Sequence, residues 1–431
     1  MTAVSDMSVH RETFNRLKSK FPGSRQDWVQ DLRRDNLDRF ESMGYPTTRL
    51  EAWKKLNLRP ITQGSFELAT SSGNPSKSLP ANLVRHTVCF VDGHFSPDLS
   101  DIANLPQGIR VRTLSTALEQ SDTDSLPSFF GQAATDEKHA FLALNGALFT
   151  DGAIVEIDDA VAEPVSLRFI QTDGADPRVT YTRVLVRVAP QAQVDLIEEF
   201  VGEGKNLTNH VTEVVVGENA GLRHLRFQDE SQSGFHLGVL GYVLERNARL
   251  ESFAVSLGAA LSRVDGHVSL QGEGAEANLQ GLYTLRGDQV CDHHTLLHHR
   301  VPHTHSQQLY KGILAHSARA IFNGQVTIDK DAQKTTADQQ NPNLLLSDQA
   351  LVNTNPQLEI YADDVQCRHG ATVGQMDEDS LFYLRSRGIP KDQAVRLLMQ
   401  AFAAEVVEAI PNESVRDQIS ERVRERFFSS V

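Results

Sequence analysis

Short stretches of alternating apolar and polar residues fill the sequence from about residue 84 to residue 374. Clear examples, each followed by turn-forming residues, are AIVEID, RVLVRVAP, VTEVVVG and AIFNGQVTID. Alternation with a period of two over four to eight residues is typical of half-buried β-strands. Outside residues 114–147 this region lacks the longer periodicity of helices, so we predict a mainly β core domain over residues 84–375.

Four of these stretches also recur at a nearly fixed spacing. They begin at Ala192, Ala220, Ala248 and Ala275, with steps of 28, 28 and 27 residues. A period of 20–50 residues is typical of stacked architectures, and strands without intervening helices favour a β-solenoid among them. The alternative is a chance alignment of alanines in an alanine-rich sequence.

Helical segments are predicted on both sides of this core. In DWVQDLRRDNLDRFESM, Trp28, Leu32, Leu37 and Phe40 follow helical spacing, and Gly44 is suited to end the helix. The stretch TSSGNPSKSLPAN then has the composition of a linker or surface loop. We therefore assign residues 1–83 to an N-terminal helical region with its linker.

Residues 376–431 are predicted to form a C-terminal helical region. Asp377 is a suitable N-cap, Gly388 a suitable helix end, and Pro390 a suitable start for a longer helix. That helix carries one apolar stripe, which comprises Ala394, Leu397, Leu398, Ala401, Phe402, Val406 and Ala409. The region is too short for a core of its own, so its stripe packs either on the β-domain or on another protein.

The charge and cysteine content narrow the classes of protein. The chain of 431 residues has a formal net charge of −14 and no basic stripe, which argues against nucleic-acid binding. Its three cysteines, Cys89, Cys291 and Cys367, lie far apart, as in proteins of a reducing compartment. The polar N-terminus does not resemble a secretory signal, and no apolar run is long enough for a membrane span. We expect a cytoplasmic protein.

The stretch from Cys291 to Ser306, CDHHTLLHHRVPHTHS, is a candidate metal site. It contains six histidines, at 293, 294, 298, 299, 303 and 305. In a strand, His294 and His298 would share one face while His293 and His299 share the other. This division argues against one closed site, although a metal-dependent β-helix enzyme using residues 293–305 remains the alternative interpretation.

Other enzyme and nucleotide-binding motifs are missing. The sequence contains no GxxxxGK[ST] loop, so we expect no nucleotide to be bound by this chain itself. It also lacks a GxSxG elbow and a dinucleotide-binding GxGxxG fingerprint, so no flavin or nicotinamide is assigned.

A smaller candidate site lies within YADDVQCRHGATVG. Cys367 and His369 are two residues apart, which would place a thiol and an imidazole on the same face of a strand. Such a pair suits iron, zinc or copper(I), but two ligands do not close a site. The pair is either half of a site completed by another subunit or a buried cysteine beside a hydrogen-bonded histidine.

A family resemblance covers nearly the whole chain. The run QKTTADQQNPNLLLSDQALVNTNPQLEIYADDVQCRHGATVGQMDEDSLFYLRSRGI resembles the C-terminal signature of the SufB/SufD family of iron–sulfur cluster assembly proteins, and in particular of its SufD members. Further matches are YPTTRLEAWKKLNL, LNGALFTDG, SQQLYKGIL and ARAIFNGQVTI.

This resemblance implies a right-handed parallel β-helix core with helical segments at both ends. It further implies a non-catalytic scaffold that works with a SufB-type subunit and a SufC-type ATPase. The edge of the β-helix would pair with SufB, and a transient iron–sulfur cluster would be shared across that interface. His369 would bind iron or the nascent cluster, with Cys367 as a weaker second ligand. A homodimeric scaffold that binds a cluster by itself is a rival interpretation.

The same resemblance implies that residues 377–431 dock the SufC-type ATPase. We expect the apolar stripe of the long helix to supply the contact, through Leu397, Leu398, Phe402 and Val406.

Overall fold

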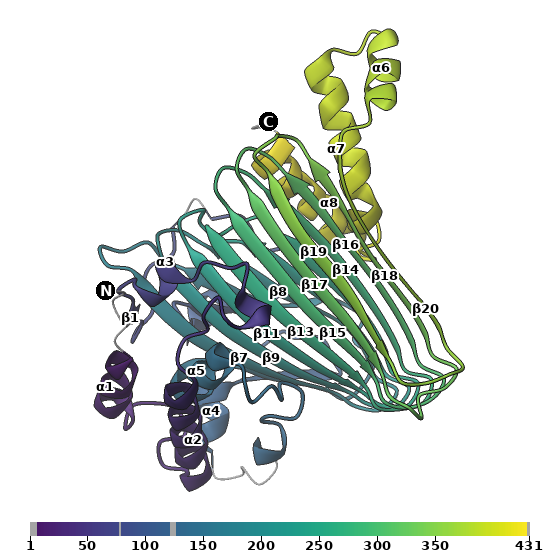
Figure 1. Ribbon diagram of the computed structural model, residues 1–431. Helices are drawn as coiled ribbons and strands as arrows, with labels where there is room; N and C mark the ends of the chain where they lie inside the picture. The colour runs from purple at the N-terminus through teal and green to yellow at the C-terminus, as the bar shows by residue number, and fades with distance from the viewer. Residues whose placement is uncertain (1–6, 77–78, 121–125, 429–431) are drawn as a thin grey trace.

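In the computed structural model, two large β-sheets face each other and wind into a tapering solenoid with helices on its outer faces (Figure 1). The structure describes residues 7–76, 79–120 and 126–428. Residues 1–6, at the N-terminus used above to argue against a secretory signal, and residues 77–78 of the predicted linker lie outside the described ranges.

The strands alternate between the two sheets along the chain. Sheet A consists, in spatial order, of β19 (Leu351–Ile360), β17 (Arg319–Ile328), β15 (Val290–His299), β13 (Leu261–Leu270), β11 (Phe235–Leu244), β9 (Leu207–Val216), β7 (Arg178–Val188), β5 (Asp151–Ile157) and β4 (Ile109–Thr113), with β1 (Glu67–Leu68) paired to β7. Sheet B consists of β20 (Gln366–Gln375), β18 (Thr336–Leu345), β16 (His305–Leu314), β14 (Glu276–Leu285), β12 (Arg249–Ser256), β10 (Gly221–Asp229), β8 (Gln193–Gly202), β6 (Val165–Gln171), β2 (His86–Val91) and β3 (His94–Phe95). All neighbours pair in parallel except β2 with β3 and β4 with β5. The predicted β-solenoid is therefore confirmed.

The alanine repeat is one turn of this solenoid. The backbone N–H of Gly221 donates to the carbonyl of Ala192 at 2.9 Å, and Arg249 donates to Ala220 in the same way. The residue before each of the four alanines has a positive φ, between 54° and 73°, at Gln191, Asn219, Asn247 and Gly274. Each turn thus reverses the chain at an equivalent left-handed residue, and the alanine enters the buried core directly after it.

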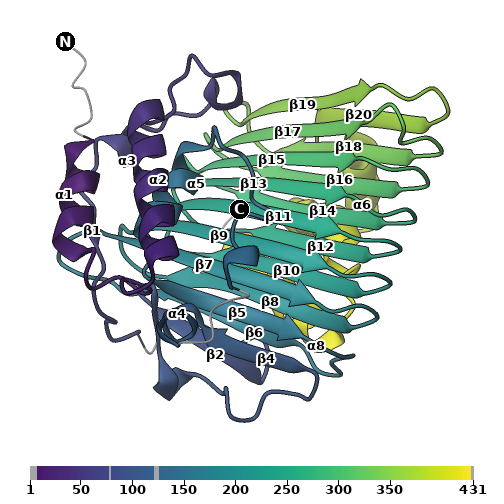
Figure 2. The ribbon, with the colours of Figure 1, turned by 90° about the horizontal axis from the view of Figure 1, so that it is seen from below.

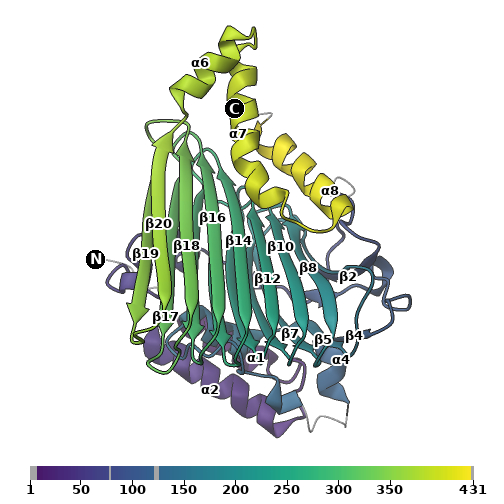
Figure 3. The same ribbon diagram turned by 90° about the vertical axis from the view of Figure 1, so that its right-hand side faces the viewer.

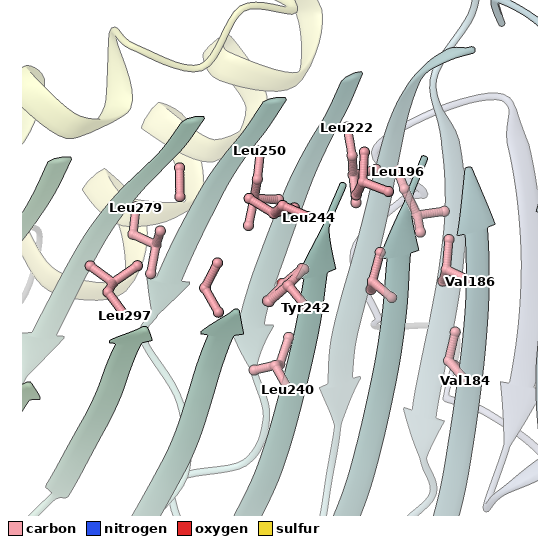
Figure 4. Close-up of a cluster of buried hydrophobic side chains, with 14 of the residues drawn as sticks. Val184, Val186, Leu196, Leu222, Leu240, Tyr242, Leu244, Leu250, Leu279 and Leu297 are labelled. Atoms are coloured by element: carbon pink, nitrogen blue, oxygen red, sulfur yellow. The ribbon is translucent and has the colours of Figure 1, made fainter. Parts of the chain in front are cut away.

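Much of the interior between the two sheets is apolar. Figure 4 shows Leu196, Leu222, Leu250 and Leu279 of sheet B directed toward sheet A residues such as Tyr242. Each of these side chains is at least 96% buried. Because full burial of one leucine contributes about 1.5–3 kcal/mol, these stacked columns account for much of the stability of the fold.

N-terminal helices cover part of the outer face of sheet A (Figure 2). α5 (Ala140–Leu148) lies on β7 and β9, and α2 (Asp27–Met43) packs on α5. Gly44 ends α2 with a φ of 68°, as the sequence predicted. The remaining helices of this part are α1 (Ser8–Leu17), α3 (Arg59–Thr62) and α4 (Leu114–Glu119), with short 3-10 turns at Glu51–Trp53, Pro97–Leu99 and Leu126–Ser128.

C-terminal helices cover part of the outer face of sheet B (Figure 3). They are α6 (Glu378–Ser386), α7 (Lys391–Val407) and α8 (Glu413–Val423), followed by a π-helical turn at Arg424–Phe428. Asp377 caps α6 by accepting from the N–H of Ser380, as predicted, and Asn412 caps α8 by accepting from Val415. Within the described ranges, no helix combines the length and apolar character that a membrane crossing requires.

Two interior glycines provide a matched test of the packing. A Cβ atom on Gly312 would lie 2.3 Å from the ring of the buried Tyr283, whereas one on Gly266 would meet nothing closer than 3.8 Å. We expect Gly312→Ala to reduce the free energy of unfolding by about 1–3 kcal/mol because the core is overpacked. Gly266→Ala should leave it nearly unchanged, as measured by denaturant unfolding. Equal effects of the two substitutions would contradict this packing.

Candidate site at the open end of the solenoid

The last two strands leave the end of the solenoid open. β19 pairs only with β17, and β20 pairs only with β18, so the outer edge of each is free in the part of the chain that the structure describes. Large apolar side chains are exposed here, and Leu351, Tyr361 and Val373 have exposed fractions of 47%, 63% and 47%. An exposed strand edge with apolar side chains is a template for pairing with another chain.

The candidate residues Cys367 and His369 lie on this last strand. In the β18–β20 register, Cys367 is paired with Ala337 and His369 with Gln339. Both partners are fully buried and belong to the interior face of sheet B. Cys367 and His369 therefore share the interior face of β20, as their spacing predicted. No further strand covers them, so Cys367 is half-buried and His369 is exposed.

The surroundings of the pair are polar. Burial raises the pKa of the Cys367 thiol, which lowers its thiolate fraction at neutral pH. On the neighbouring position, Arg368 donates to the Asp338 carboxylate at 2.7 Å. A surface hollow of about 330 Å³ lies beside Arg368 and His369, and its lining also includes Asp338 and Gln340.

A thiol and an imidazole can ligate iron, but the chain does not complete a site around them. Among the described residues, no group of three or more His, Cys, Asp or Glu side chains is placed to hold a metal ion. Closed sites for soft metals usually have four ligands, so a metal held by Cys367 and His369 would need further ligands from outside this chain.

The histidine-rich stretch divides between two faces of β15, as predicted. His293 and His299 are buried in the solenoid interior. His294 and His298 lie on the outer face and are partly exposed. His303 occupies the turn with a φ of 58°.

Each buried histidine of this stretch has local partners. His299 lies 2.7 Å from the Thr304 hydroxyl and 2.9 Å from the Ser306 hydroxyl. The His293 ring lies 5.5 Å from the Tyr283 ring and 5.3 Å from the Tyr310 ring. These contacts make the stretch a set of packed polar residues, and the alternative of a metal-dependent enzyme gains no support.

Two residues of the predicted apolar stripe, Ala394 and Val406, are buried within the chain, so Val406 is not available for the predicted docking contact. Val406 is completely buried against sheet B, together with Met399 and Ala403. Phe402 is partly buried, with the Lys311 ammonium 4.1 Å from the centre of its ring. Leu398 is half-buried, and Leu397 alone of the four predicted residues is exposed, at 40%.

A different part of this region is free. α6 has no buried residue, and Phe382 and Tyr383 are 74% and 58% exposed. Figure 3 shows α6 and the start of α7 projecting beyond the end of the sheets. The sequence contains a signal for this surface. Two adjacent aromatic residues in LFYL point in different directions on a helix this short, so both cannot be buried on one face.

The structure defines a class of protein: a β-solenoid with an open end, a cysteine and a histidine on one face of its last strand, and a projecting helix. Two family models match most of the chain. Residues 169–402 match the SufBD core domain of SUF-system iron–sulfur cluster assembly, and residues 8–167 match the N-terminal region of SufBD proteins. The chain belongs to the SufBD family and has a role in iron–sulfur cluster assembly.

Similar proteins carry the same description. An iron–sulfur cluster assembly SufBD family protein of Synechocystis is 33% identical over 93% of this chain and 92% of its own length. The iron–sulfur cluster assembly protein SufD of Escherichia coli is 31% identical over 91% of each chain. SufD of Bacillus subtilis is 27% identical over 97% of this chain and 98% of its own.

The structural role of His299 predicts a specific pH dependence. Burial lowers the pKa of His299 to about 3, below its ordinary value of 6.5. Below pH 6.5 the unfolded state therefore binds more protons, and stability is lost as the pH falls. Between pH 7.5 and 5.0 this residue alone costs about 2 kcal/mol.

We expect His299→Gln to remove about 2 kcal/mol of this pH-dependent loss, measured by urea unfolding at the two pH values. His305→Gln is the matched control, because His305 is exposed at the start of β16. A pH dependence unchanged by His299→Gln would mean that His299 is not a buried neutral residue.

Proposed function

We propose that this chain is a non-catalytic, SufD-type scaffold subunit that works in the cytoplasm with a SufB-type subunit and a SufC-type ATPase. The observation that carries the proposal is the open last turn of the solenoid, where an incomplete Cys367–His369 pair lies beside free strand edges. A second solenoid subunit on this end would supply both the missing strand pairing and the missing ligands.

The partner surface consists of β19, β20 and their exposed apolar side chains. A SufB-type subunit would pair along these edges, using the backbone N–H and C=O groups that no strand in the described ranges occupies. Leu351, Tyr361 and Val373 would then be covered. A second copy of this chain presents the same edges, so a homodimer is the competing assembly at this surface.

Iron or the nascent iron–sulfur cluster is the cargo of this interface. His369 would bind iron through an imidazole nitrogen, which is available because the side chain is exposed. Cys367 would be the weaker ligand, because burial raises the pKa of its thiol and the proton must leave before a thiolate bond forms.

We further propose that the ATPase docks on α6 and the start of α7. Phe382, Tyr383 and Leu397 offer the exposed apolar contact there, in place of the buried Val406. The chain lacks a phosphate-binding loop motif of its own, so nucleotide energy must come from such a partner.

One helix connects this docking surface to the solenoid. α7 begins beside α6 and continues onto β14 and β16. There Lys311 of β16 donates to Glu405 at 2.6 Å, and Arg422 of α8 donates to the buried Glu199 at 2.6 Å. A movement imposed on α6 by nucleotide binding would therefore be transmitted to sheet B and to its open end.

The site prediction concerns His369. In the complex of this chain with SufB-type and SufC-type subunits, we expect His369→Ala to leave assembly intact and to lower cluster formation at least tenfold, because an iron ligand is lost. Cys367→Ala should have a smaller effect in the same direction. Cluster formation is measured by the visible absorbance of the reconstituted complex.

His305→Ala is the control for this experiment, because His305 is another exposed histidine on sheet B. Loss of the partner subunits from the His369→Ala complex would reassign His369 to a structural role. Unchanged cluster formation in that variant would remove it from the site.

The docking prediction concerns the exposed aromatic residues of α6. We expect Phe382→Ser with Tyr383→Ser to lose the SufC-type ATPase in co-purification while the chain stays folded, since neither side chain is buried. Leu99→Ser, at another apolar residue that is 44% exposed, is the control. Retention of the ATPase by the double variant would place the dock elsewhere. Deletion of residues 377–431 is a poorer test, because it also uncovers sheet B and leaves Glu199 without Arg422.

A further inference from the structure

The middle of the solenoid interior contains polar side chains, although apolar side chains would cost less free energy to bury there. Glu198 and Arg226, from β8 and β10, are at least 94% buried there, and Gln308 and Gln339, from β16 and β18, are at least 99% buried. Buried polar groups destabilise a fold unless they are paired, so their arrangement calls for an explanation.

These buried polar side chains form a line through the interior from Glu198 to Gln339, which we call the polar file. Its first part is an ionic cluster. The Glu198 carboxylate accepts from the Thr212 hydroxyl at 2.7 Å and from the Arg226 guanidinium at 3.1 Å. Arg226 also lies 3.3 Å from the His236 imidazole, and His236 lies 2.9 Å from Glu230. Every charge of this cluster therefore faces an opposite charge or a hydrogen-bonding group.

A small cavity continues the file toward the open end. Its volume is about 30 Å³, and its lining includes Arg226, His236, His293 and Thr295. That volume accommodates one or two water molecules, and the lining offers the polar partners that a buried water requires.

The last part of the file is a chain of directed amides. Gln308 donates its side-chain N–H to the Thr295 hydroxyl at 2.6 Å, and Gln339 donates to the Gln308 oxygen at 2.6 Å. Gly324 leaves room for this arrangement, because a Cβ there would lie 2.1 Å from Nε2 of Gln339. The nitrogen of Gln339 is thus held toward the interior, which leaves its oxygen for another donor.

That oxygen has no partner among the residues that the structure describes. The Gln339 side chain is completely buried, and its Oε1 makes no hydrogen bond. The next side chain on the same face, one strand further toward the open end, is His369. No hydrogen bond joins the two side chains in this structure. Neighbouring strands lie about 4.8 Å apart, so a change of the His369 side-chain rotamer brings the imidazole within reach of this oxygen.

We propose that Gln339 is a positioning residue for His369. When the His369 ring turns toward the interior face, Oε1 of Gln339 accepts its imidazole N–H and so fixes the tautomer and the ring orientation, leaving the other nitrogen directed at iron. This inference rests on the proposed function of His369 as a ligand. A hydrogen bond of this kind to the second nitrogen is the usual support of a metal-binding histidine, and its loss typically lowers metal affinity about 10–100-fold.

The rest of the file explains why a glutamine can perform this role. A glutamine amide that was free to rotate would present its N–H₂ group or its oxygen to His369 with similar ease. The hydrogen bonds of this chain of side chains remove that choice. The amide nitrogen of Gln308 donates to Thr295, and the amide nitrogen of Gln339 donates to Gln308, so each amide has one orientation.

The test compares Gln339→Met with Gln340→Met, its neighbour on the opposite, exposed face of β18. The chain is labelled with ¹⁵N-histidine, and the His369 signals are assigned by their loss in His369→Gln. We expect the two ring nitrogens of His369 to show one dominant tautomer in the native chain and in Gln340→Met. Gln339→Met should shift the two ring nitrogens of His369 toward a mixture of tautomers.

Cluster formation by the complex is measured on the same variants. We expect Gln339→Met to lower it about tenfold or more, with unchanged recovery of the partner subunits. An unchanged His369 spectrum in Gln339→Met overturns the inference, whether or not cluster formation falls, because the effect would then be structural. If His369→Ala itself leaves cluster formation intact, the proposed function fails instead, and the two failures are thereby distinguished.

Discussion

Parallel, in-register pairing of successive turns is the interaction on which the rest of this structure depends. Each strand from β5 to β18 satisfies its backbone groups on both neighbours, and equivalent side chains stack into columns such as Leu222, Leu250 and Ala277. The same pairing leaves the final turn unsatisfied, because no strand in the described part of the chain pairs with the outer edges of β19 and β20. A fold that grows by repetition ends in a cap or in an interface. Here the helices cover parts of the outer faces and the end stays open, so the open end is a candidate surface for a partner.

That open end also explains the incomplete chemistry of the candidate site. Cys367 and His369 lie in the same columns as buried residues of the preceding turn, so a subunit added to the end would bury them at the new interface. A site divided between two subunits can be assembled or opened by a movement of one against the other. The α7 helix, held to sheet B through Lys311 and Glu405, gives such a movement a path from the projecting α6.

The sequence predicted the fold well because the solenoid repeats a local pattern. The alanine spacing identified one column of the core, and Gly44 and Asp377 marked helix ends through local backbone chemistry. The same-face placement of Cys367 and His369 followed from strand geometry alone. The packing partner of a helix was harder to predict, because the apolar stripe containing Val406 could be buried either against this chain's own β-domain or against another protein. The polar file ending at Gln339 was not predicted, because polar residues inside β18 resemble those of an exposed strand until the opposing sheet is placed.

The proposed interface with the SufB-type partner is the open turn formed by β19 and β20. It can be tested by hydrogen–deuterium exchange of this chain, alone and in complex with that partner. We expect slower exchange in residues 351–375 on complex formation, with little change in strands β8 to β12 at the middle of the solenoid. Unchanged exchange in residues 351–375, with protection on another surface, would contradict it.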